Sequence, residues 1–334
     1  MDAAHHRGGR VTTEHRDLVA AGASAGGVEA LRALVAGLPA GYPGAVLVVL
    51  HVPRAAPSAL PAILSRSGPL PAAPARDGDL VRGGTVYVAP ADHHLLLLDG
   101  HLRLSRGPAE NGHRPGIDPL FRSVARAAGR RAIGVVLSGA RDDGAAGLAA
   151  IASRGGTTVV QDPEDALHPW MPRAALETVV ADHIAPAAAI GPLLAALTAT
   201  PLAPGPDPGP DPLLDSEVAM SELFPMTSDR IGTPTGFGCP SCGGGLFQIE
   251  GKPLPRFRCR VGHAWSPESL LDEQAEALES ALWMALRALK EKAELSRRMA
   301  AGGRERYLSA AEDAEAAAGT LRELIARLGA TAAG

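Results

Sequence analysis

A serine flanked by glycines stands where a short apolar segment gives way to a helical pattern. Residues 18–27 read Leu-Val-Ala-Ala-Gly-Ala-Ser-Ala-Gly-Gly, which places Ser24 in a Gly-x-Ser-x-Gly sequence between an expected strand and an expected helix. The glycines allow a tight turn that leaves the hydroxyl exposed. The N–H of Ala25, at the start of the helix, could stabilise an oxyanion beside that hydroxyl. The pattern is typical of a nucleophilic serine, although a plain glycine-rich turn or a phosphate-binding loop would have the same glycines.

A nucleophilic serine needs a base and a group that orients the base. His51 follows the apolar run 45–50, and Asp142 and Asp143 follow the apolar run 132–138. Open α/β sheets bind their ligands at the carboxyl ends of the strands, so these side chains and Ser24 could meet at one edge. Each has a plainer interpretation alone: a histidine after a strand is usually a hydrogen-bonded polar residue, and an aspartate before a helix is usually a cap.

Two common families with glycine-rich turns do not fit the chain. The α/β-hydrolases carry the serine, then the acid, then the histidine, whereas the order here is serine, histidine, acid. The dinucleotide fingerprint Gly-x-Gly-x-x-Gly is not matched by Gly22, Gly26 and Gly27, and no acidic residue closes the second expected strand.

Strand and helix patterns alternate from residue 18 to residue 197, which favours a doubly wound, mostly parallel α/β sheet with helices on both faces. Residues 95–105 interrupt this alternation with a β-hairpin whose turn is Asp99-Gly100, and we expect it to be an antiparallel edge of the sheet. The expected strands are 18–22, 45–50, 85–89, 132–138, 156–160 and 183–185, and expected helices include 26–37, 118–129, 144–154 and 172–180.

Several blocks between residues 17 and 197 resemble the catalytic domain of the chemotaxis-receptor glutamate methylesterases (CheB-type). They occur in the family's order and with similar gaps. The blocks are Gly22-Ala-Ser-Ala-Gly-Gly27, Leu50-His-Val-Pro53, Val86-Tyr-Val-Ala-Pro90 with His94, His113-Arg-Pro-Gly-Ile-Asp118 and Gly139-Ala-Arg-Asp-Asp-Gly144.

The resemblance implies a role for each matching residue. Ser24 would be the nucleophile, His51 the general base and acid, and Asp143 the orienting carboxylate, while Asp142 falls on a position that varies in the family. The backbone N–H groups of Ala25 and Ala140 would form the oxyanion hole, and catalysis would need no cofactor.

Three residues depart from the family pattern near this site. Ala25 replaces a threonine and Ala140 replaces a methionine, but the oxyanion donors are main-chain groups, which a side-chain change need not remove. Arg141 replaces a glycine, and its guanidinium could recognise acidic substrate segments or crowd the entrance.

The resemblance implies a protein-glutamate methylesterase that acts on methylated chemotaxis-type receptors and that could also deamidate glutamines. Two alternatives stay open: a serine hydrolase of another ester or amide, and a non-catalytic regulatory binding protein of signalling arrays. Family enzymes often carry a receiver domain before the catalytic domain, and the short segment before residue 18 leads us to expect none here.

The composition of the chain restricts the classes of molecule that the protein can bind. The chain has 334 residues, a formal net charge of −4 and only 3% aromatic residues, which does not favour nucleic-acid binding. Residues 1–16 are polar and lack the apolar run of a signal peptide, and the longest aliphatic stretches are strand-length. We therefore expect a cytoplasmic protein with no membrane insertion.

All three cysteines lie in the last hundred residues. Cys239 and Cys242 form a Cys-x-x-Cys pair, and Cys259 with His263 forms a second pair sixteen residues further on. Two such pairs supply four ligands for a tetrahedral structural zinc, and four protein ligands leave no open position for catalysis. The module is locally basic, so nucleic-acid binding is the alternative to a purely structural role; its basic residues are Lys252, Arg256, Arg258 and Arg260.

The region after residue 198 divides into three segments. Residues 199–212 are so rich in proline that they exclude regular helix and predict an extended linker, and a short helix could follow at 215–223. After the zinc module, a helix start at Ser266-Pro-Glu and a glycine stop near residue 302 predict a helical hairpin with a leucine stripe, which could mediate self-association. The expected organisation is a disordered N-terminus (1–16), the methylesterase-like domain (17–197), a linker (198–235), the zinc ribbon (236–266) and the helical hairpin (267–330).

Overall fold

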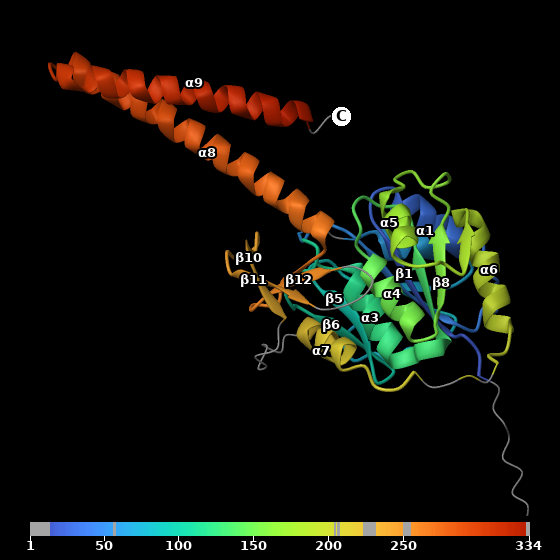
Figure 1. The fold of residues 1–334 in the computed structure, drawn as a ribbon. Helices are drawn as coiled ribbons and strands as arrows, with labels where there is room; N and C mark the ends of the chain where they lie inside the picture. The colour runs from blue at the N-terminus through green and yellow to red at the C-terminus, as the bar shows by residue number, and fades with distance from the viewer. Residues whose placement is uncertain are drawn as a thin grey trace, which may run out of the picture. The chain divides into compact units, whose positions relative to one another are not determined.

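The structure, a computed structural model, describes residues 14–55, 58–203, 205, 208–222, 232–249 and 255–331 (Figure 1). Most of the N-terminus that was expected to be disordered lies outside these ranges, as does Lys252. The chain divides into two compact units, residues 1–269 and residues 270–334. The first unit contains every sequence-predicted functional residue, so the fold is described mainly there.

A parallel sheet of seven strands forms the centre of the first unit, in the order β3-β4-β2-β1-β7-β8-β9. Each strand predicted between residues 18 and 185 is present, and the short edge strand β3 is additional. The strands are β1 (Leu18–Ala23), β2 (Ala45–Leu50), β3 (Ala72–Pro74), β4 (Val86–Val88), β7 (Ala132–Val136), β8 (Thr157–Gln161) and β9 (His183–Ala185).

Helices cover both faces of this sheet, as predicted for a doubly wound fold (Figure 1). Alternate residues of the central strands enter two separate apolar clusters: Leu47 and Val49 belong to one, Val46 and Val48 to the other. The first cluster includes residues of α3 (Ile117–Ala128), α4 (Ala145–Ser153) and α5 (Trp170–Thr178), and the second includes residues of α1 (Gly27–Ala36), α2 (Leu60–Ser67) and α6 (Ala187–Ala199). A 3₁₀ turn, η1 (Gly129–Arg131), joins α3 to β7.

The predicted hairpin forms, but its predicted place in the sheet is wrong. Strands β5 (His94–Leu98) and β6 (His101–Ser105) pair antiparallel as a separate two-stranded sheet. Leu95, Leu97 and Leu102 are buried in the same cluster as α3, and the Leu97 N–H donates to Ser123 Oγ of α3 at 3.0 Å. Burial of this leucine face against α3 holds the hairpin away from the sheet edge, where β3 is the last strand.

The segment predicted as a linker contains a packed helix. Helix α7 (Pro212–Ser221) begins after Asp211, whose side chain accepts the N–H of Leu214 at 3.0 Å as an N-cap. Leu214 and Val218 are buried in the cluster that contains α3. Because these two side chains are buried, α7 packs against the core of the first unit directly after the proline-rich stretch.

The described residues 232–249 and 255–266 form a small antiparallel sheet, which we call the cysteine module. Its four strands are in sequence order, and they carry the three cysteines and His263 at or near their ends. The strands are β10 (Thr233–Gly238), β11 (Gly245–Ile249), β12 (Arg256–Cys259) and β13 (Ala264–Trp265).

A buried ion cluster joins the cysteine module to α3 and α7. Glu110 receives Arg122 Nη2 at 2.5 Å and Arg258 Nη2 at 3.2 Å, and Glu217 pairs with Arg256. Burial raises the pKa of Glu110, but the three guanidinium groups outweigh burial and hold that pKa well below its usual range. Arg256 and Arg258 face this cluster, which corrects the interpretation that they form a basic surface.

The second unit is the predicted helical hairpin. Helix α8 (Pro267–Ala301), which begins in the first unit, is followed by the 3₁₀ turn η2 (Glu305–Tyr307) and α9 (Leu308–Thr331), and Arg297 of α8 pairs with Glu315 of α9. The predicted leucine stripe is buried only in part: Leu286 is buried, whereas Leu271 and Leu278 are exposed. No helix among the described residues is long and apolar enough to cross a membrane.

Gly22 offers a test of how tightly β1 packs beside the site. A Cβ at Gly22 would lie 2.3 Å from Ile117 Cγ2, whereas a Cβ at Gly41 would meet no atom within 4 Å. We predict that Gly22→Ala lowers the free energy of unfolding by about 1–3 kcal/mol through overpacking, and that Gly41→Ala changes it by at most about 0.5 kcal/mol. Urea unfolding measures both, and equal effects of the two variants would contradict the packing described for β1.

Candidate active site

Three neighbouring strands place the predicted serine, histidine and aspartate at one edge of the sheet. Ser24 follows β1, His51 follows β2 and Asp143 lies in the loop after β7, and these strands are adjacent in the order β2-β1-β7. Backbone bonds fix the first two residues: the Ser24 N–H donates to Ser138 O at 2.9 Å, and the His51 N–H donates to Ala23 O at 3.1 Å. The structure therefore brings together the three side chains that the sequence places on separate strand ends.

The three side chains form a continuous hydrogen-bonded chain. Ser24 Oγ lies 3.1 Å from His51 Nδ1, and His51 Nε2 lies 2.8 Å from Asp143 Oδ2. The side chains of His51 and Asp143 are only 6% and 1% exposed. A carboxylate can only accept a hydrogen bond, so Nε2 carries the proton and Nδ1 has a free lone pair toward the serine. In the Ser-His-Asp template, Nε2 faces the serine and Nδ1 faces the aspartate. Here the two nitrogens exchange these places, and the imidazole can carry out the same proton transfer.

Asp143 receives several further hydrogen bonds. The Ile117 N–H donates to Oδ2 at 2.7 Å, and Asn111 Nδ2 donates to Oδ1 at 3.1 Å. Burial raises the pKa of Asp143, but the bond from His51 and the neighbouring imidazoles outweigh burial and hold that pKa well below its usual range. Asp143 is therefore a carboxylate that stays ionised in a buried place, as the orienting member of such a chain must be.

Two residues beside the histidine were not predicted to act at the site. The His113 ring stacks on His51 with centroids 3.7 Å apart and an interplanar angle of 14°. Burial, and then the charge of His51, lowers the pKa of His113 to about 4, so the stacked ring is neutral at neutral pH. Asn111 is buried and has a φ of 50°, a left-handed conformation that asparagine tolerates. The only sequence signal for these two residues is the family-like block 113–118. It contains His113, and Asn111 lies just before it.

Asp118 holds the helix that follows Asp143. Its Oδ1 accepts the N–H groups of Gly144 at 3.1 Å and Gly147 at 2.6 Å, at the start of α4. Burial, and then the negative charge of Asp143, raises the pKa of Asp118 to about 7. Asp118 therefore keeps its proton to a higher pH than Asp143 does, although the two aspartates share one buried region.

The segments that contain the expected oxyanion donors, Ala25 and Ala140, approach Ser24. Ala25 follows the serine directly, and Gly26 adopts a φ of 70° at the N-cap of α1, which turns the chain sharply. The loop that contains Ala140 approaches from β7: a Cβ at Gly139 would lie 2.9 Å from Ser24 Cβ. Arg141, next in this loop, has a φ of 63° and is half-buried. In contrast, Gly22 has no left-handed φ, and its role is to make room for Ile117.

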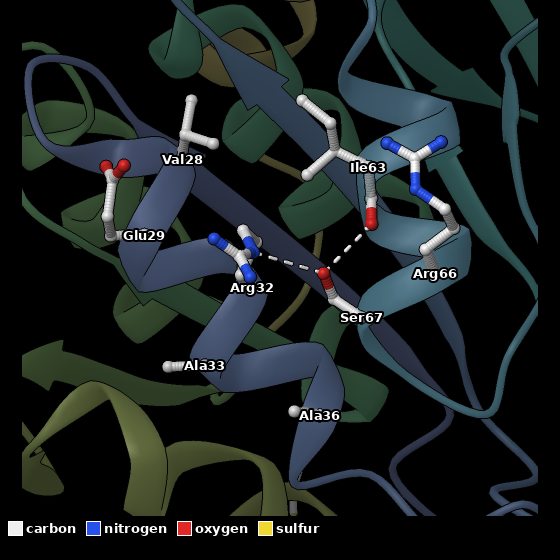
Figure 2. Close-up of a pocket in the computed structure, with 8 residues that line it drawn as sticks. All are labelled: Val28, Glu29, Arg32, Ala33, Ala36, Ile63, Arg66 and Ser67. Atoms are coloured by element: carbon white, nitrogen blue, oxygen red, sulfur yellow. Dashed lines mark hydrogen bonds between the residues drawn. The ribbon is translucent and has the colours of Figure 1, made fainter.

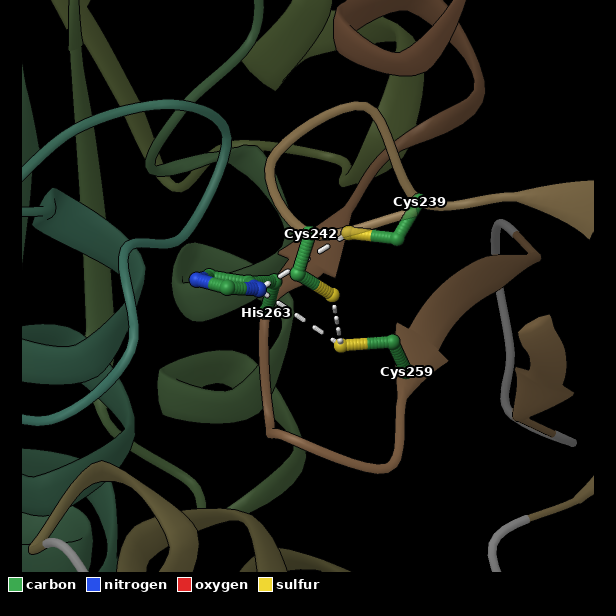
Figure 3. Close-up of side chains that lie close together, drawn as sticks. All are labelled: Cys239, Cys242, Cys259 and His263. Atoms are coloured by element: carbon green, nitrogen blue, oxygen red, sulfur yellow. Dashed lines mark hydrogen bonds between the residues drawn. The ribbon is translucent and has the colours of Figure 1, made fainter. Parts of the chain in front are cut away.

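The three cysteines and His263 converge in the cysteine module, as the sequence predicts (Figure 3). Their ligand atoms all lie within 4.8 Å of one another. Cys242 Sγ is 3.7 Å from Cys259 Sγ, and His263 Nδ1 is 3.5 Å from Cys259 Sγ and 3.7 Å from Cys239 Sγ. Trp265 Nε1 donates to Cys239 Sγ at 3.5 Å. The four groups form a compact donor set that is compatible with a metal ion.

A pocket between α1 and α2 is separate from the serine site (Figure 2). It has a volume of about 780 Å³, and Arg32 Nε donates to Ser67 Oγ across it at 3.2 Å. Its lining includes neither Ser24, His51 nor Asp143. Its polar lining residues are Glu29, Arg32, Arg66 and Ser67, and none of them belongs to the serine site.

Residues 19–194 match the family model described as CheB methylesterase. The chain belongs to this family. The matched segment contains Ser24, His51 and Asp143 and ends before the cysteine module begins. The sequence-based resemblance is thereby confirmed for the first part of the chain.

Curated relatives and a solved structure agree with this family over the same part. A protein-glutamate methylesterase/protein-glutamine glutaminase of Anaeromyxobacter dehalogenans (strain 2CP-C) is 42% identical over 187 residues, which are 55% of this chain and 51% of the relative. A protein with that name from Pseudomonas aeruginosa is 40% identical over 51% of this chain and 49% of its own. The chain spans about half the length of these relatives. The crystal structure of the Thermotoga maritima CheB methylesterase catalytic domain superposes with a TM-score of 0.53 at 31% identity, covering 55% of this chain and 99% of that domain.

The raised pKa of Asp118 predicts a dependence of stability on pH. Because this pKa is about 7 in the folded protein and 3.8 in the reference state, the folded protein binds more protons between those two values. The contribution of Asp118 to the free energy of unfolding therefore falls as the pH rises from about 4 to about 7. We predict that Asp118→Asn, which keeps the Oδ1 acceptor and does not titrate, gains stability relative to the parent across this window. Urea unfolding at several pH values measures the difference, and a constant difference would contradict the prediction.

Proposed function

We propose that this protein hydrolyses glutamate methyl esters on chemotaxis-type receptors, with Ser24, His51 and Asp143 as its catalytic residues. The observation that carries the proposal is the hydrogen-bonded chain of these three side chains at the carboxyl edge of the sheet. Membership of the CheB methylesterase family and the names of the curated relatives supply the substrate class.

In the proposed reaction, Ser24 Oγ attacks the ester carbonyl carbon while its proton moves to His51 Nδ1. The resulting imidazolium donates through Nε2 to the ionised Asp143, which stabilises the charge. The N–H groups of Ala25 and Ala140 would bind the oxyanion. The ester C–O bond then breaks, and His51 returns the proton to the leaving methanol. A water molecule, deprotonated by His51, attacks the acyl-serine and releases the glutamate carboxylate and the free serine.

The same residues could hydrolyse a glutamine side-chain amide, because His51 can protonate an amine leaving group as well as an alkoxide. The curated relatives carry both activities in their printed names. We therefore propose receptor glutamine deamidation as a second activity of the same site. Neither reaction needs a metal or an organic cofactor in this mechanism.

We further propose that Cys239, Cys242, Cys259 and His263 bind one structural zinc ion. A tetrahedral zinc with Zn–S bonds of about 2.3 Å and a Zn–N bond of about 2.0 Å separates two sulfurs by about 3.8 Å and a sulfur from the nitrogen by about 3.6 Å. Three of the donor–donor distances, at 3.5–3.7 Å, fit these edges, and all of them are at most 4.8 Å. The ion would stabilise a module too small to fold on its own core, and reduced cysteines agree with a cytoplasmic location.

The nucleophile is tested by its removal. We predict that Ser24→Ala lowers methanol release from methylated receptor fragments by about four to six orders of magnitude, whereas Ser153→Ala, at an exposed helix position, leaves it within about twofold. Gas chromatography measures the methanol. Release by Ser24→Ala at the rate of the parent would contradict the proposal.

The metal site is tested by its stoichiometry. We predict about one zinc per parent chain, measured by atomic emission, and near-complete loss of zinc in Cys259→Ser and His263→Ala. His101→Ala is the matched control, because His101 is exposed in β6 and distant in sequence from the ligands. A parent protein that retains no more zinc than Cys259→Ser would contradict the site.

A further inference from the structure

We infer that Asn111 is a positioning residue for the His51–Asp143 pair, and that the cysteine module holds Asn111 in place through the backbone N–H of Ser266. The inference rests on the proposed roles of Ser24, His51 and Asp143. It goes beyond them because it makes a part of the chain outside the family match a structural component of the active site.

Asn111 uses both ends of its side-chain amide in this contact. Oδ1 accepts the Ser266 N–H at 2.9 Å, and Nδ2 donates to Asp143 Oδ1 at 3.1 Å, with Asp118 Oδ2 a further 3.4 Å contact. The side chain is buried, so water does not replace these partners. Asn111 therefore bridges a carboxylate of the candidate active site to the start of α8.

The Ser266 N–H determines which way the amide faces. A backbone N–H can only donate, so the amide oxygen must face Ser266 and the NH₂ group must face the carboxylates. The reversed amide would place its oxygen against Asp143 and two N–H donors against one another. Ser266 thus selects the orientation in which Asn111 stabilises the ionised form of Asp143.

The backbone around Asn111 is bound to the same module. The Asn111 N–H donates to Ala264 O at 2.8 Å, and the Ala264 N–H donates to Ala109 O at 3.4 Å. Glu110, between these residues, carries the ion pairs with Arg122 and Arg258. A shift of the cysteine module would therefore move residues 109–111 with it.

A second contact reaches the residue next to Asp143. Asp142 Oδ1 accepts Ser266 Oγ at 2.9 Å and Ser269 Oγ at 2.8 Å. These bonds hold the loop but do not touch the Asp143 carboxylate. They supply a matched control, because Ser269→Ala breaks one attachment of the loop and leaves the Asn111 contacts intact.

Loss of the Asn111 donor has a defined electrostatic consequence. Without this donor, the Asp143 carboxylate would interact more strongly with the His51 Nε2–H. This stronger interaction favours the protonated form of the pair. The pair would then lose its proton at higher pH, and the imidazole would also be held less firmly. The other ionisable groups that interact with Asp143 would be unchanged; they are His94, His113, Asp118 and Asp142, with Arg122 and Arg256 acting on Asp118 and Arg141 on His113.

The test is the pH profile of Ser24 labelling by a fluorophosphonate in the full-length protein. Asn111→Gly tolerates the left-handed φ and removes the donor, while Asn111→Asp keeps the size and acceptor but not the amide donor. Ser266→Pro removes the N–H after a strand residue that is already extended, and it also removes the Oγ that bonds Asp142 and accepts the Ser269 N–H. We expect each to raise the midpoint of the acid limb by about half to one pH unit and to slow labelling at the optimum about tenfold. Ser266→Ala, which removes that Oγ and keeps the N–H, and Ser269→Ala should leave the midpoint in place.

A second readout does not depend on reactivity. The downfield proton resonance of His51 Nε2–H, identified by its loss in Asp143→Asn, should shift in Asn111→Gly and in Ser266→Pro but not in Ser269→Ala. Thermal unfolding checks that each variant is folded, and Asn111→Asp replaces Asn111→Gly if that variant is not. Both changes interrupt the chain of contacts from Ser266 through Asn111 to Asp143. The double variant Asn111→Gly/Ser266→Pro should therefore shift the midpoint and the resonance by less than the sum of the single shifts.

The outcomes separate this inference from the proposed function. An unchanged acid limb and resonance in folded Asn111→Gly would overturn the role of Asn111. A shift in Asn111→Gly without one in Ser266→Pro would overturn the role of the cysteine module. A parent protein that the fluorophosphonate does not label would contradict the proposed function, and the His51 resonance alone would then decide the inference.

Discussion

The structure around the candidate active site depends on one buried carboxylate that must stay ionised. Asp143 is 1% exposed, and a charge removed from water is costly unless donors surround it. Its donors come from different parts of the chain: His51 after β2, Ile117 at the start of α3, and Asn111 beside the cysteine module. The requirement to satisfy this one charge therefore links the sheet edge, the helix that packs on it and the module that follows the family domain.

The cysteine module is joined to the family domain by charge as well as by hydrogen bonds. Glu110 and Glu217 lie among three arginines in a region that is almost entirely buried, so removing either glutamate would leave buried guanidinium groups without a compensating charge. A buried ion cluster of this kind fixes the position of the cysteine module on the family domain more than it raises the free energy of unfolding. The proposed zinc ion would hold together the segments next to this cluster, since its ligand Cys259 follows Arg258 directly and His263 precedes Ala264, which bonds to residues 109 and 111.

The alternation of apolar runs and helical patterns predicted the parallel sheet because burial on both faces leaves a clear signal. It also predicted that Ser24, His51 and Asp143 share an edge, since each follows a strand. Asn111 could not be found in this way: its partner Ser266 is 155 residues away, and an Asn-Gly pair in a loop predicts only a turn. The hairpin and the basic residues Arg256 and Arg258 were misplaced for a related reason, because composition does not show which surface a segment packs against.

The central claim is that His51, held by Asp143, activates Ser24 as a nucleophile. Its most direct test is fluorophosphonate modification of the full-length protein, with the modified residue identified by mass spectrometry, in the parent and in His51→Gln. The account predicts a single rapid modification at Ser24 that slows by about three orders of magnitude or more when His51 is replaced. Modification of Ser24 at the same rate in both proteins, or no modification of Ser24 in the folded parent, would contradict it.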